Sequence, residues 1–264
     1  MIVTVANRKG GVGKTTTSVF LAHALAEATG ASCALIDADP QASAAQWAQR
    51  AADAGHLLSV PVLAQPTPKL AQTVPDTQHV VIDTPPADLD IIAAAIELAD
   101  LVVVPTSASA LDLSLVPVTV EAAARSGKPA AVLLTSTRRT RSIGAAEDSL
   151  RDAGVRVLRA RIALREALAM AFGQPVRQLH GYELVAAELL GALPDQPYSV
   201  EAVRQRVAST QVGHNKANSP RLHRAVLTQQ FAAQVAHRPR PISSGDDEIV
   251  QRLRASMARL ANQR

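Results

Sequence analysis

The sequence predicts an α/β fold in which a doubly wound, mainly parallel sheet is flanked by helices and followed by a helical C-terminal extension. Short apolar runs alternate with alanine-rich segments of helical spacing over the first two-thirds of the 264 residues. A glycine-rich loop separates the first apolar run from the first helical segment, at the edge where such sheets bind ligands. The apolar runs stop before Tyr198, which predicts a different kind of structure in the remainder.

Six apolar runs rich in Val, Ile and Leu are the main predicted strands. They are Ile2–Ala6, Cys33–Ile36, His79–Ile82, Leu101–Val104, Ala130–Leu134 and Val155–Leu158. Most are unbroken rather than alternating, as expected of strands buried on both faces of a parallel sheet. The proline-rich stretch Ser59–Pro75 predicts one more short strand followed by a surface connection.

Alanine-rich segments between these runs have the spacing of helices that cross from one parallel strand to the next. They are Thr15–Ala28, Ser43–Ala54, Leu89–Leu98, Leu111–Arg125, Ser142–Ala153 and Tyr182–Leu193. Pro117 stands early enough in its segment to lie in a first helical turn.

A pair of prolines, Pro194 and Pro197, predicts the end of the first domain. The chain is therefore divided into an α/β domain, residues 1–194, and a basic extension, residues 195–264, that is helical or partly disordered. The first part holds 16 Lys and Arg against 18 Asp and Glu, and the second holds 11 against 5. The basic excess behind the net charge of +4 thus belongs to the extension.

Composition excludes several classes of protein. Cys33 is the only cysteine, which excludes intrachain disulfides and cysteine-ligated zinc and favours a cytoplasmic location. No uncharged apolar stretch approaches the roughly 18 residues of a membrane-spanning helix. With one Trp, two Tyr and three Phe, the chain is poorly equipped to stack nucleic-acid bases on aromatic side chains.

The strongest motif, KGGVGKTT at Lys9–Thr16, follows a predicted strand and opens a predicted helix, as a phosphate-binding loop must. Glycines allow successive N–H groups and the helix N-terminus to face phosphates. Lys14 is expected to reach the β- and γ-phosphates of ATP, and the Thr15 hydroxyl to bind Mg²⁺. The predicted nucleotide-binding residues are Gly10, Gly11, Val12, Gly13, Lys14, Thr15 and Thr16.

Aspartates follow two of the other predicted strands. Asp37 and Asp39 come directly after the run Cys33–Ile36, and Asp83 directly after His79–Ile82. Because the carboxyl ends of neighbouring parallel strands meet beside the first loop, these carboxylates can face a metal ion or a hydrolytic water. Thr15, Asp37 and Asp83 are the predicted metal residues.

These motifs together resemble those of ParA-type partition ATPases, within the deviant Walker A class of P-loop NTPases that includes ParA and MinD. In the loop, Arg8 replaces the first glycine of the common pattern and Lys9 stands five residues before Lys14, as in that class. The similarity covers about residues 1–193 and is closest to short, ParF-like plasmid members. Further matching stretches are residues 37–47, 83–86, 104–106, 111–114, 160–167 and 172–176.

The resemblance implies a DNA-segregation ATPase that forms a homodimer when it binds ATP. Lys9 is then expected to reach the nucleotide of the partner subunit, so that Lys9, Lys14 and Asp39 are the catalytic residues. Asp37 and Asp83 are expected to support the metal and the water.

The ATP-bound dimer is expected to bind DNA without sequence preference, which places the protein on the nucleoid. A ParB-like centromere-binding partner is expected to stimulate hydrolysis. The arginines predicted to contact DNA are Arg138, Arg139, Arg141, Arg159, Arg161 and Arg165.

Two other functions stay open. One is a MinD-like or cargo-positioning ATPase that acts on a membrane or a protein assembly, and the other is a regulatory binding module that uses ATP as a conformational ligand. The final helix candidate, residues 246–262, has a modest apolar face without Phe or Trp. This composition favours a helix packed on the body or a partner over a membrane-binding helix, and an arginine-rich arm for DNA is a third interpretation.

Overall fold

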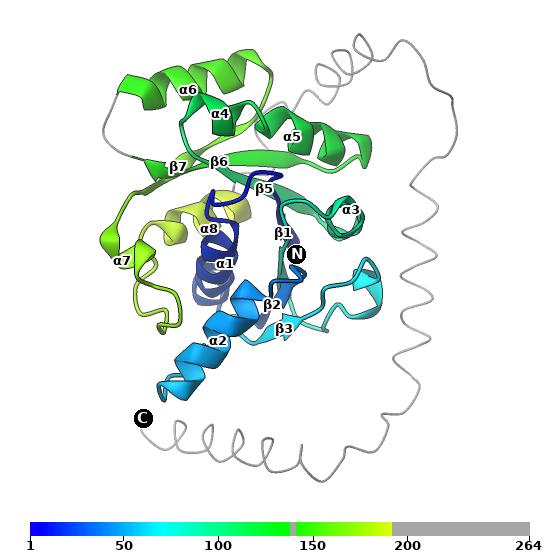
Figure 1. The fold of residues 1–264 in the computed structure, drawn as a ribbon, viewed down its shortest axis with the longest axis vertical. Helices are drawn as coiled ribbons and strands as arrows, with labels where there is room; N and C mark the ends of the chain where they lie inside the picture. The colour runs from blue at the N-terminus through cyan, green and yellow to red at the C-terminus, as the bar shows by residue number, and fades with distance from the viewer. Residues whose placement is uncertain (138–140, 192–264) are drawn as a thin grey trace. The chain divides into compact units, whose positions relative to one another are not determined.

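The computed structural model describes residues 1–137 and 141–191. They form one seven-stranded sheet in the order β3-β2-β4-β1-β5-β6-β7, in which every neighbouring pair is parallel (Figure 1). The strands are β1 (Ile2–Val5), β2 (Cys33–Asp37), β3 (Val62–Ala64), β4 (His79–Asp83), β5 (Leu101–Thr106), β6 (Ala130–Thr137) and β7 (Val157–Ala163). The predicted doubly wound sheet is confirmed.

Helices cover both faces of this sheet. They are α1 (Lys14–Thr29), α2 (Ser43–Asp53), α3 (Leu89–Leu98), α4 (Ala110–Leu113), α5 (Val116–Arg125), α6 (Arg141–Asp152), α7 (Glu166–Ala169) and α8 (Tyr182–Gly191), with a short 3-10 helix, η1 (Leu70–Gln72). Alternate residues of the buried strands face opposite layers, so that Val103 packs with α1 and α8 while Val102 and Val104 pack with α3 and α5. The helices α1, α2 and α8 lie on one side of the sheet and α3, α5 and α6 on the other (Figure 1).

The predicted helix Leu111–Arg125 is wrong as a single element. The structure has a short helix, α4, and then a second one, α5, that begins at Val116. Pro117 occupies the first turn of α5, as the sequence predicts for it. A proline has no N–H to continue a helix that comes from Leu111, so the chain ends one helix and starts another.

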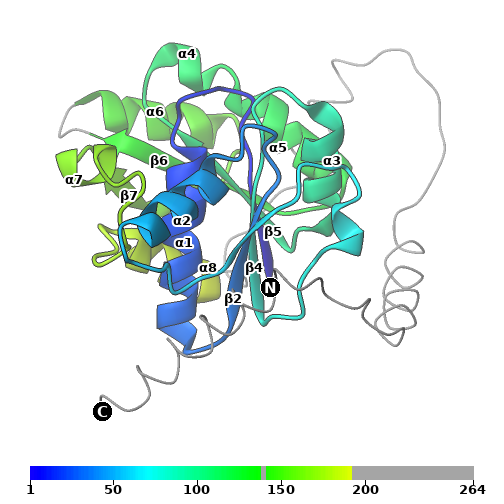
Figure 2. The ribbon, with the colours of Figure 1, turned by 60° about the horizontal axis from the view of Figure 1, so that its bottom comes forward.

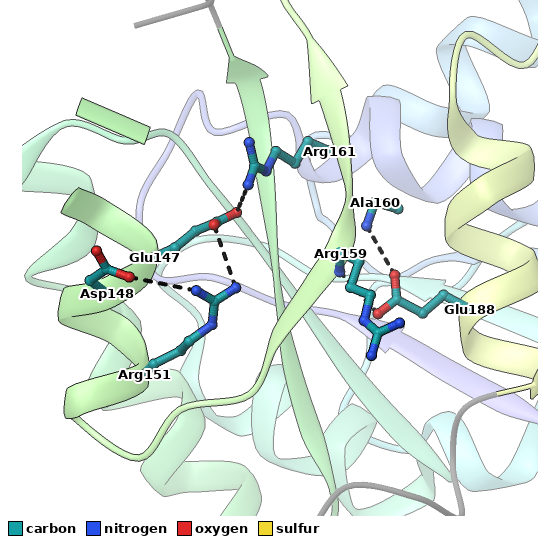
Figure 3. Close-up of polar contacts among 7 residues, drawn as sticks. All are labelled: Glu147, Asp148, Arg151, Arg159, Ala160, Arg161 and Glu188. Carbon is teal, nitrogen blue, oxygen red and sulfur yellow. Dashed lines mark hydrogen bonds and ion pairs between the residues drawn. The ribbon is translucent and has the colours of Figure 1, made fainter. Parts of the chain in front are cut away.

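The last strand also differs from the predicted run Val155–Leu158. It is β7, Val157–Ala163, in which buried and exposed residues alternate because the strand lies at the edge of the sheet. Its register with β6 shifts between Val157 and Arg161. In this irregular stretch the carboxylate of Glu188 on α8 accepts hydrogen bonds from the N–H groups of Arg159 (2.9 Å) and Ala160 (3.0 Å), as drawn in Figure 3.

An aromatic cluster joins α1 and α2 to the segment before α8. The Phe20 ring lies 6.0 Å from Trp47 and 5.4 Å from Tyr182, and Trp47 lies 5.8 Å from Phe172. The Trp47 indole N–H donates to the Gln174 carbonyl oxygen at 2.8 Å. Three segments far apart in the sequence are thereby fixed to one another.

The predicted domain boundary at residues 194 and 195, and the helices expected after it, lie outside the described residues. Within residues 1–137 and 141–191, no helix has the length and apolarity to cross a bilayer.

Gly173 tests the packing of the segment before α8 against α2. Its φ is +78°, and a Cβ built there would lie 2.9 Å from the Cβ of Arg50. Gly173→Ala is expected to lower the free energy of unfolding by about 1–3 kcal/mol. The control is Gly144→Ala at an exposed position in the first turn of α6, where nothing lies within 4 Å. This change is expected to raise the free energy of unfolding by about 0.5–1 kcal/mol. Urea unfolding measures the free energy of unfolding of both variants. If the two substitutions change this free energy in the same direction, this account of the packing between the segment and α2 is contradicted.

Candidate functional site

The phosphate-binding loop lies between β1 and α1, at the carboxyl end of the strands and opposite the N-terminus (Figure 2). Gly11 (φ +77°) and Gly13 (φ +87°) have left-handed backbone that side chains rarely adopt, and nothing lies within 4 Å of a Cβ built at either. The helix α1 begins at Lys14, directly after Gly13. The loop therefore brings free N–H groups and open space to the positive end of a helix, which suits a phosphate chain.

Two further side chains, Asn7 and Thr135, hold this loop in place, and the sequence analysis did not single out Asn7. Asn7 is fully buried, donates to the Pro105 carbonyl at 2.8 Å and accepts the N–H of Lys9 at 2.9 Å. The Thr135 hydroxyl lies 3.0 Å from the Val12 carbonyl and 3.2 Å from the Thr106 carbonyl. The loop is thus tied to the ends of β5 and β6. The sequence signal that could have identified Asn7 is a polar residue placed directly after a buried strand.

Lys14 is almost fully buried beside the loop. Its ammonium donates to the Lys9 carbonyl at 3.0 Å, and its side chain is drawn back over the loop rather than into solvent. Burial lowers the pKa of Lys14, while the charges of Asp83 and Asp39 oppose that change. The cation thus stands near Asp83 and Asp39 and beside the glycines, where an anionic phosphate can pair with it.

Asp83 ends β4 and pairs in register with Asp37, the last residue of β2. The Ser18 hydroxyl of α1 donates to its Oδ1 at 2.9 Å, whereas its Oδ2 has no hydrogen bond of standard geometry to any described residue. Burial raises the pKa of Asp83 to about 7; Asp37 adds to the rise, and the hydroxyls of Thr15 and Ser18 and the charge of Lys14 oppose it. A buried carboxylate with a spare oxygen suits a cation.

Asp37 and Asp39 do not face the site in the same way. Asp37 is fully buried, and its two oxygens accept backbone N–H groups, Oδ1 that of Asp39 (3.1 Å) and Oδ2 that of Ala45 (2.8 Å). Burial raises the pKa of Asp37, and these hydrogen bonds oppose the rise. Asp39 accepts the N–H of Gln41 at 2.9 Å through Oδ1 alone.

The site fits Mg²⁺-ATP on the chemistry of its own groups. Thr15 at the start of α1 and Asp83 across from it supply the oxygen ligands that Mg²⁺ prefers, and Lys14 supplies the cation for phosphate. When bound, Mg²⁺ neutralises charge on the phosphate oxygens. Among the described residues, no group of three or more His, Cys, Asp or Glu side chains forms a metal cluster of its own, so the metal would share its ligands with the nucleotide.

The predicted DNA contacts are spread over β7 and its surroundings. Arg159 and Arg165 are exposed and make no ion pair with the described residues, whereas Arg161 pairs with the buried Glu147 at 2.6 Å (Figure 3). Arg141 opens α6, and Arg138 and Arg139 lie outside the described residues. Arg161 therefore ties α6 to β7, and contact of these arginines with DNA stays a prediction.

The profile of the CobQ/CobB/MinD/ParA nucleotide binding domain matches residues 3–176. This span contains the phosphate loop, the three aspartates and all seven strands except Ile2, the first residue of β1. The chain belongs to this family. It is accordingly an ATPase that uses ATP and Mg²⁺, as the motifs predict, and the broader resemblance to ParA and MinD is confirmed.

The chain is 39% identical over 197 residues to the maintenance of carboxysome distribution protein A of Gloeobacter kilaueensis, a match that covers 73% of this chain and 83% of that one. Its fold is similar to that of the septum site-determining protein MinD of Pyrococcus horikoshii with Mg-ADP (TM-score 0.59, 17% identity, covering 71% and 95%). It is also similar to that of a plasmid partition protein of Borrelia burgdorferi bound to AMPPNP (TM-score 0.57, 19% identity, covering 72% and 97%). These two structures establish the fold of the ATPase.

The raised pKa of Asp83 gives a stability test with a definite sign. The folded protein holds this proton to about pH 7 and the unfolded chain releases it near 3.8, so the free energy of unfolding without nucleotide falls as the pH rises between these values. Asp83→Asn removes this contribution to the fall, and at pH 8 its free energy of unfolding is expected to exceed that of the wild type by about 4 kcal/mol.

The same variant is expected to lose the stabilisation that Mg²⁺-ATP gives the wild type. Urea unfolding at pH 5 and pH 8, with EDTA or with Mg²⁺-ATP, measures both effects, and Asp76→Asn at an exposed position is the control. A variant less stable than the wild type at pH 8 without nucleotide would contradict this electrostatic account.

Proposed function

We propose that this ATPase positions a large protein assembly in the cell. The observation that carries the proposal is the 39% identity to a carboxysome distribution protein, over most of both chains. The phosphate loop, its buried lysine and the aspartates supply the nucleotide switch that such a task requires. Cargo positioning, one of the two open alternatives in the sequence analysis, is therefore favoured over DNA segregation.

The nucleotide cycle that we propose assigns a role to the phosphate loop, Asp39, Asp83 and Lys9. Residues 10–16 bind the phosphates with Lys14 at their centre, Thr15 and Asp83 hold Mg²⁺, and Asp39 orients the attacking water. The Lys9 side chain is half-buried, and its ammonium makes no hydrogen bond or ion pair with the described residues. In a homodimer formed around ATP it is available to the nucleotide of the partner subunit, which links assembly to the bound nucleotide.

The surface on which the dimer moves is, in this proposal, DNA. The exposed Arg159 and Arg165, with Arg138, Arg139 and Arg141, would contact phosphates without reading sequence, so that binding weakens steeply with salt. This places the dimer on the nucleoid in the cytoplasm. A partner bound to the cargo, rather than a centromere-binding protein, would stimulate hydrolysis and release the dimer.

DNA segregation is the second candidate. It is favoured by the shared fold of a plasmid partition protein and by the ParF-like motifs, and it requires the same ATP cycle. The two functions differ in the object that is moved.

Deletion of the gene in its own host, with fluorescent labels on the candidate assemblies and plasmids, separates the two candidates. We expect evenly spaced assemblies to collapse into one or two clusters per cell while plasmids are retained. The wild-type gene restores the spacing, whereas Lys14→Ala does not, because phosphate binding depends on this ammonium. Lys69→Ala, at an exposed position away from the loop, is the matched control and restores spacing fully.

Plasmid loss with unchanged assemblies would instead establish segregation. Normal spacing with Lys14→Ala would contradict every function driven by ATP.

A further inference from the structure

Asp37 caps the N-terminus of α2, a helix whose own N-cap residue has no capping side chain. The residue before α2 is Ala42, which has no side-chain acceptor and adopts a left-handed φ of 51°. In its place Asp37, from the end of β2, accepts the N–H of Ala45 in the first turn of α2 at 2.8 Å. A carboxylate at this helix end satisfies an N–H group that otherwise lacks a partner and complements the helix dipole.

The same carboxylate organises the loop between β2 and α2. Its other oxygen accepts the N–H of Asp39 at 3.1 Å, while Asp39 itself accepts Gln41 N–H through Oδ1 and Ala42 N–H through its carbonyl. The loop is therefore fixed at both ends by Asp37, and the position of the Asp39 side chain follows from that of the loop. Non-glycine residues hold a left-handed φ, as Ala42 does, only where surrounding contacts impose it.

Trp47 reports on the position of α2. It is the only tryptophan of the chain, 2% exposed, and its indole bonds to the Gln174 carbonyl at 2.8 Å. A shift of the first turn of α2 moves this ring relative to Phe20 and Phe172, which lie 6.0 Å and 5.8 Å from it. Its fluorescence therefore responds to the state of α2 without any nucleotide present.

We propose that Asp37 is a positioning residue for ATP hydrolysis, which clamps the loop 38–42 to α2 so that Asp39 is held in place, and that it does not support the metal ion. Each of its oxygens accepts a backbone N–H, and the side chain is 0% exposed. Asp83 differs on this point, because its Oδ2 has no such partner among the described residues. The two aspartates lie in register on neighbouring strands but have different roles. Asp37 holds the backbone of the loop, whereas Asp83 keeps an oxygen for the cation.

Asp37→Asn in the full-length chain tests the proposal. The amide keeps one acceptor but turns a donor toward the second N–H, so the loop is released at one end. We expect kcat to fall by about tenfold, while the Kd for a fluorescent ATP analogue and the Mg²⁺ concentration that half-saturates its binding stay within about twofold. Acrylamide quenching of Trp47 in the nucleotide-free protein is expected to rise. Asp53→Asn, at the exposed far end of α2, leaves all four quantities unchanged.

A second substitution provides a rescue. Glycine adopts the left-handed φ of position 42 without strain, so Ala42→Gly in the Asp37→Asn background is expected to restore part of kcat and the shielding of Trp47. A change in the Mg²⁺ requirement of fivefold or more would assign Asp37 to the metal and overturn the proposal. A loss of hydrolysis with unchanged Trp47 quenching, or a failure of Ala42→Gly to restore any activity, would also overturn it.

Discussion

The structure of the site follows from the burial of three charged groups at one place. Asp37 and Asp83 are 0% exposed and Lys14 is 7% exposed, where β2, β4 and the phosphate loop meet. A buried charge is costly unless hydrogen bonds or an opposite charge compensate it. Backbone N–H groups around α2 compensate Asp37, the Ser18 hydroxyl binds Asp83, and the Lys9 carbonyl accepts Lys14. Each partner fixes one element around the nucleotide site.

This arrangement gives α2 a central position. Its first turn is held by a buried carboxylate at the edge of the site, and its middle is held by Trp47 to the carbonyl of Gln174. Arg50, one turn later, lies over the Phe172 ring with 5.0 Å between its guanidinium carbon and the ring centroid. A change at the phosphates that moves the loop 38–42 is therefore expected to reach the surface segment before α8, where Met170 is 71% exposed.

Much of this was predictable from the sequence. Buried strands such as Leu101–Thr106 are continuous apolar runs, and a motif such as KGGVGKTT combines rare residues in a fixed order, so local chemistry suffices for both. The edge strand β7 was misplaced because its exposed arginines hide the strand pattern. The helices α4 and α5 were merged because the helical spacing of the sequence continues across Ser114 and Leu115, where the structure has a break. The clamp by Asp37 and the support from Thr135 join residues through tertiary hydrogen bonds, which no local pattern encodes.

Hydrogen exchange with and without Mg²⁺-ATP tests most directly whether the buried charges couple the nucleotide to α2. The account predicts that ATP slows exchange in residues 9–17 and changes it in two further segments, 37–47 and 170–178, while β5 (Leu101–Thr106) stays unchanged. Slowed exchange in the phosphate loop with identical exchange in residues 37–47 would contradict it, because the loop and α2 would then respond to ATP independently.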